Sequence, residues 1–141
     1  MAYGAHSKPL QPLGALAPRP GSEEWPLDAL APLAGRLDES LSEKVADYLA
    51  GSPNFLAWME HTRDVIGDTF GVSGGSSILS DGVFYWRLDA ADYVRAYRIE
   101  VPTGAIQNME ANRWTPPDFS REEYNGIFAS LMRLLHPSTE L

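Results

Sequence analysis

Two short apolar runs flank an Asp-Gly pair near the middle of the chain and give its clearest structural signal. Residues 77–80 and 83–87 are rich in β-branched and aromatic side chains, and Asp81-Gly82 lies between them. Asp-Gly favours a type I′ turn, because both central residues of that turn need a positive φ. The pattern therefore predicts a β-hairpin over residues 77–87.

The second strand of this hairpin places its aromatic side chains on opposite faces. Phe84 and Trp86 share one side, where packing against a helix is expected, and Tyr85 points to the other. Tyrosine is common among the residues that dominate protein interfaces. Tyr85 is therefore a candidate for an exposed interface anchor.

Most of the remaining apolar positions recur at helical spacing. Asp89 can cap a helix and Asp92 falls in its first turn, where a carboxylate favours the positive end of the helix dipole. Ser120 and Glu123 have the spacing of a capping box. The predicted helices span residues 27–37, 38–50, 55–66, 89–97, 103–112 and 120–136. For residues 55–66 a strand is the alternative, because residues 56–59 also form a short apolar run.

The chain length and the proline distribution set the predicted domain organisation. The chain has 141 residues, 44% of them hydrophobic, which suits one domain with a core of its own. Residues 1–26 are rich in proline and predict an N-terminal tail, either extended on the domain or flexible. Residues 27–141 then form a single α+β domain, mainly helical, with a small sheet around the hairpin.

Composition narrows the function classes. The chain has no cysteine, which excludes disulfides and thiolate catalysis, and no signal peptide or apolar run of membrane-spanning length, so a cytoplasmic location is expected. The formal net charge of −8 argues against nucleic acid as a partner. It suits either a basic protein partner or solubility alone.

The acidic residues are unevenly distributed. Residues 38–68 carry seven acidic side chains against two basic ones, and the hairpin with its helix adds three more carboxylates. If these segments share a surface, they form an acidic patch that would steer a basic partner. The alternative is carboxylates spread around the domain.

One group of residues suggests a different chemistry. His61, Asp64 and Asp68 have the spacing i, i+3, i+7, which would place them on one face of a helix, as in a metal-assisted hydrolase. A solvated polar face beside Arg63 is the competing interpretation. No nucleophile motif or zinc-binding histidine pair accompanies them. We therefore expect no enzymatic activity, no metal and no cofactor.

A set of short motifs within residues 43–135 follows a recognisable pattern: Thr62-Arg63-Asp64-Val65, Gly74-Gly75, Ile78, Asp81-Gly82, Tyr85-Trp86, Asp89, Asp92-Tyr93-Val94, Tyr97 and Val101-Pro102. In these motifs the chain resembles a family of small actinobacterial-type proteins, many of them similar to immunity proteins of bacterial polymorphic toxin systems. It departs from the family pattern at Ser80, Tyr85 and Val101. These motifs concern packing more than activity.

The resemblance implies a protein that binds and neutralises a cognate toxin without covalent chemistry. We expect that toxin to be basic, a nuclease or a nucleic-acid deaminase. A housekeeping interaction module is the remaining alternative. The candidate partner-binding residues are Glu60, Asp64, Asp68, Asp81, Tyr85, Asp89 and Asp92.

Overall fold

The computed structural model describes residues 9–21 and 24–136. Its helices are α1 (Glu39–Gly51), α2 (Ala90–Tyr97), α3 (Thr103–Ala111) and α4 (Arg121–Leu135), with short 3₁₀ turns η2 (Gly14–Leu16), η3 (Leu27–Ala29) and η4 (Ala31–Leu33). Its strands are β1 (Gln11–Pro12), β2 (Asn54–Leu56), β3 (His61–Arg63), β4 (Gly71–Ser73), β5 (Ile78–Ser80) and β6 (Phe84–Arg87). The predicted mainly helical α+β class is confirmed.

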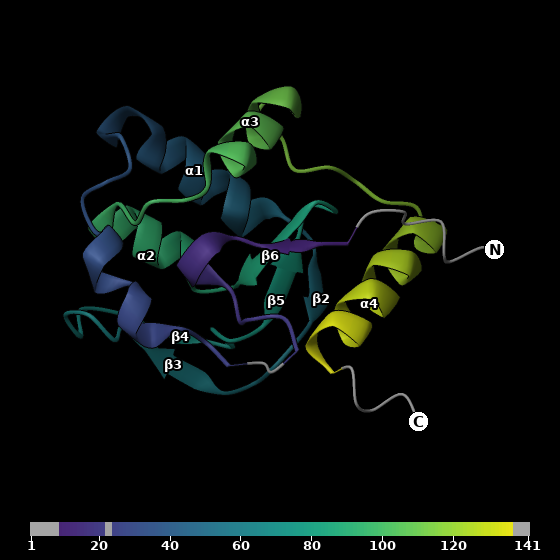
Figure 1. Ribbon diagram of the computed structural model, residues 1–141, viewed down its shortest axis with the longest axis horizontal. Helices are drawn as coiled ribbons and strands as arrows, with labels where there is room; N and C mark the ends of the chain where they lie inside the picture. The colour runs from purple at the N-terminus through teal and green to yellow at the C-terminus, as the bar shows by residue number, and fades with distance from the viewer. Residues whose placement is uncertain (1–8, 22–23, 137–141) are drawn as a thin grey trace.

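A small mixed sheet forms the centre of the molecule. Its strand order is β1-β6-β5-β2, with β1 parallel to β6 and the other neighbours antiparallel, while β3 and β4 pair separately. Helices α1 and α2 lie on one side of this sheet and α4 on the other (Figure 1). Phe84 and Trp86 belong to the core cluster that includes α1 and α2, and Tyr85 to the cluster that includes α4. The predicted alternation is confirmed, but both faces are covered.

The 77–87 hairpin forms with a different turn from the one predicted. Gly82 has a φ of 88°, whereas Asp81 is not among the positive-φ residues, so the turn is not type I′. The Asp81 carboxylate instead accepts hydrogen bonds from the backbone N–H groups of Val83 and Phe84, at 3.0 and 2.9 Å. The side chain of Asp81 therefore holds the turn from within.

Ser120 and Asp89 begin helices as predicted, but only the Ser120 side chain caps its helix. The capping box of Ser120 and Glu123 is present at the start of α4. Asp89 occupies the N-cap position of α2 and Asp92 lies in its first turn, as predicted. The Asp89 side chain, however, caps no backbone N–H of the helix. It is held by other side chains described below.

The helix predicted over residues 55–66 is wrong. The segment forms β2 and β3, because Asn54 and Leu56 pair with β5, and His61–Arg63 pairs with β4. Short apolar runs fit both periodicities, so tertiary pairing decided between them. The helix predicted over residues 27–37 is also replaced, by η3 and η4, with Pro32 inside the second turn.

The N-terminal segment is part of the domain rather than a tail. Gln11 pairs with Phe84 in the sheet, and the backbone N–H of Leu13 donates to the carbonyl of Tyr85 at 3.0 Å. Leu13 and Leu16 are fully buried. Prolines did not prevent this docking, because an edge strand tolerates them. Over residues 10–17 the predicted tail lies on the domain and contributes to its core, and residues 1–8 and 22–23 of the predicted tail lie outside the described part.

Candidate functional site

Asp64 organises the loop between β3 and β4. Its buried carboxylate accepts hydrogen bonds from the backbone N–H groups of Ile66, Gly67 and Thr69, and from the hydroxyls of Thr69 and Tyr97. Burial alone would raise the pKa of this carboxyl, but the hydrogen bonds outweigh burial and hold its pKa below the usual value. The residue is thus occupied within the fold.

We expect this carboxylate to make the protein sensitive to acid. Because the folded-state pKa of Asp64 lies below that of the unfolded chain, its stabilisation is present above about pH 4 and is lost as the pH falls further. Between pH 5 and pH 3, the free energy of unfolding should therefore fall less for Asp64→Asn than for the wild type. This pH range brackets the ordinary aspartate pKa of about 4. Urea denaturation at each pH measures this, and parallel pH curves would contradict it.

Asp81 joins the hairpin to two helices. Its Oδ2 accepts hydrogen bonds from the Tyr48 hydroxyl on α1, at 2.7 Å, and from the Asn108 amide on α3, at 2.9 Å. Asn112 donates in turn to the Tyr48 oxygen at 2.9 Å. Burial raises the pKa of Tyr48, and the neighbouring Asp81 charge raises it further. Asp81 is buried in this network and is not exposed to a partner.

Asp89 forms a buried ion pair with Arg87. Two hydrogen bonds, of 2.9 and 2.8 Å, join its carboxylate to Nε and Nη2 of the arginine. The Thr62 hydroxyl donates to the same carboxylate at 2.9 Å, and the Arg87 guanidinium lies 3.6 Å from the centre of the Trp25 ring. This cluster ties β3, β6 and the segment before η3 together.

Tyr85 is not the exposed anchor that was predicted. Its side chain is fully buried, and its hydroxyl donates to the carbonyl of Pro18 at 2.7 Å. Burial raises the pKa of this hydroxyl. Helix α4 and the N-terminal segment together cover the face of the strand on which Tyr85 lies, and this cover could not be inferred from the strand itself.

The other predicted partner-binding acidic residues, Glu60, Asp68 and Asp92, lie nearer the surface. Asp68 is exposed and pairs with Arg63 at 2.7 Å. Asp92 is half-buried on α2, where burial and the nearby Asp89 charge raise its pKa. Glu60 is exposed in the β2–β3 loop. Because Asp64, Asp81 and Asp89 are buried, the seven residues do not form one exposed acidic patch.

The helical face expected for His61, Asp64 and Asp68 does not exist. His61 lies on β3, and Asp64 and Asp68 lie in the loop that follows it. Within residues 9–21 and 24–136, no group of three or more His, Asp or Glu side chains is arranged to hold a metal ion. The premise of the hydrolase alternative, one helix carrying all three side chains, is therefore wrong.

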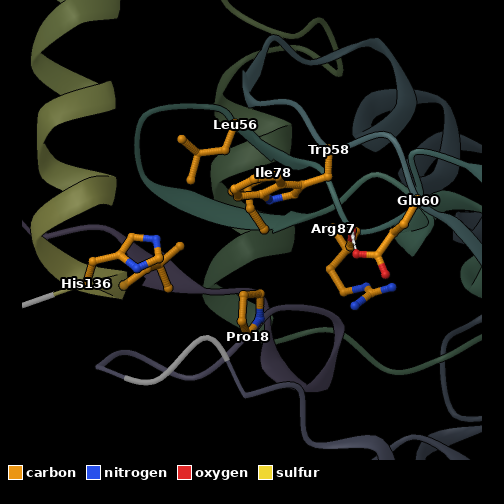
Figure 2. A pocket seen from close by; sticks show the side chains of 9 residues that line it. Pro18, Leu56, Trp58, Glu60, Ile78, Arg87 and His136 are labelled. Carbon is orange, nitrogen blue, oxygen red and sulfur yellow. Dashed lines mark hydrogen bonds between the residues drawn. The ribbon is translucent and has the colours of Figure 1, made fainter.

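A pocket of about 360 Å³ opens between the β2–β3 loop, the sheet and the C-terminal end of α4. Trp58, Glu60 and Arg87 line one side of it, and His136 lies opposite (Figure 2). Leu56 and Ile78 supply apolar wall, and the Ser76 hydroxyl donates to Glu60 at 2.9 Å. Of the lining residues, only Glu60 is among the predicted partner-binding residues.

Comparisons with protein families, curated proteins and solved structures found no significant match to this chain. Within the described ranges, no helix has the length and apolar character needed to cross a membrane.

Proposed function

We propose that this chain is an immunity-type protein, a cytoplasmic binder that neutralises a cognate toxin without chemistry of its own. The toxin would be a basic nuclease or nucleic-acid deaminase. The resemblance of residues 43–135 suggests this role, and the formal net charge of −8 suits a basic partner.

One observation carries the choice of a binding role: the exposed β2–β3 loop. Met59 is 94% exposed and its neighbour Trp58 is 47% exposed, although both are large apolar side chains. Large apolar and aromatic residues at the surface are typical anchors of protein interfaces. Glu60 follows them with an exposed carboxylate, so the loop offers apolar area and negative charge together.

The experiment pairs the chain with the protein encoded by the adjacent gene. We expect the purified proteins to form a complex by calorimetry, and co-expression to protect cells from that protein. Trp58→Ala with Met59→Ala should weaken the complex by about thirtyfold or more, the effect of removing a dominant interface residue.

Leu27→Ala is the matched control, because Leu27 is 45% exposed but lies on η3, outside this loop. Its affinity should equal that of the wild type. Absence of a complex with the purified neighbour, together with absence of protection, would contradict the proposed function.

A further inference from the structure

We infer that the pocket beside Trp58 receives an arginine side chain of the protein partner, with its guanidinium paired to Glu60 and stacked on the Trp58 indole. This inference rests on the proposed function and specifies which group of the partner is recognised. Recognition of the partner is thus placed in this pocket and not on the acidic patch that the sequence predicts.

The Glu60 carboxylate is available for such a pair. The Ser76 hydroxyl donates to Oε1 at 2.9 Å and thereby orients the carboxylate, as the dashed line in Figure 2 marks. No ion pair joins Glu60 to a basic side chain in the part of the chain that the structure describes. An incoming guanidinium would therefore compete with no cation already bound, and it could form the short charge-assisted hydrogen bonds of an arginine–carboxylate pair.

The charge balance of the pocket favours a cation. Arg87 also lines the cavity, but the Asp89 carboxylate offsets its charge through two hydrogen bonds. Glu60 is the acidic residue of the pocket lining, and within the described residues it forms no ion pair. A second carboxylate would be repelled here, whereas a guanidinium would complete the balance.

The walls suit the aliphatic part of an arginine. Leu56, Ile78 and Pro18 line the pocket and would contact the methylene groups of the incoming side chain. The half-exposed Trp58 indole offers an aromatic face to the cation. Arginine fits better than lysine, because its planar guanidinium can both pair with a carboxylate and stack on a ring.

The test uses the full ¹⁵N-labelled chain and N-acetyl-arginine methylamide as the probe. We expect a saturable shift of the Trp58 indole N–H resonance, assigned with Trp58→Phe, and none with the neutral N-acetyl-citrulline methylamide. Glu60→Gln should weaken probe binding about five- to tenfold. Glu110→Gln, at an exposed glutamate of α3, is the matched control and should leave binding unchanged.

Three outcomes would overturn the inference. Equal shifts with the citrulline probe would show that charge is not recognised, and undiminished binding by Glu60→Gln would remove the proposed partner of the guanidinium. Probe binding that depends on Glu60, together with a toxin complex that does not, would assign the pocket to a free small molecule. None of these results bears on whether the chain binds and neutralises a toxin, which the complex and the protection assay decide separately.

Discussion

Replacing Asp89 with alanine is expected to lower the free energy of unfolding by about 3–5 kcal/mol, the usual cost of leaving one member of a buried ion pair without its partner. Asp89 is 2% exposed, and its carboxylate holds both the Arg87 guanidinium and the Thr62 hydroxyl. Without it, Arg87 would remain buried with its charge uncompensated.

Asp47→Ala is the matched control for this prediction. Asp47 also pairs with an arginine, Arg95, at 2.6 Å, but its side chain is 71% exposed. Water screens such a pair, so its loss should cost no more than about 1 kcal/mol. Chemical denaturation of both variants measures the difference. Equal unfolding midpoints for Asp89→Ala and Asp47→Ala would show that the Arg87–Asp89 pair is accessible to water in solution.

The elements that could be predicted from sequence are those fixed by neighbours in the chain. The capping box at Ser120 depends on a residue three positions away, and the 77–87 hairpin depends on its own Asp-Gly turn. Residues 54–63 lacked such a signal. Their apolar side chains fit a helix or a strand, and pairing with β5 and β4 decided the outcome.

The candidate site was harder to predict, because hydrogen-bond partners far away in the sequence decide whether a carboxylate is buried or exposed. The spacing of the acidic residues along the chain does not reveal those partners. The sequence predicts Asp81 as a turn residue that binds a partner, yet Tyr48 and Asn108 hold its carboxylate inside the fold. The glycine at position 75 is the one sequence signal of this packing. In the structure, an added Cβ at Gly75 would lie 1.8 Å from the Thr62 Oγ1, next to Asp89. From the sequence alone, a glycine in this loop is explained equally well by a flexible loop.

Weakening the contact between the N-terminal segment and the core is expected to lower stability by a similarly large amount. Leu13→Ala should lower the free energy of unfolding by about 2–5 kcal/mol, the range for a leucine truncated in a closed core. The proline content leaves two interpretations of the tail, docked on the domain or flexible, and in the structure Leu13 is fully buried and its backbone N–H donates to the Tyr85 carbonyl. The variant therefore separates the two interpretations of this segment.

Leu27→Ala provides the comparison, since Leu27 is the same residue type but 45% exposed. Its free energy of unfolding, measured by urea denaturation, should lie within about 0.5 kcal/mol of the wild-type value. If Leu13→Ala changed stability as little as Leu27→Ala, residues 10–17 would not be docked on β6 in solution. The Tyr85 hydroxyl would then also lose the Pro18 carbonyl to which it donates, while α4 would still pack against its ring.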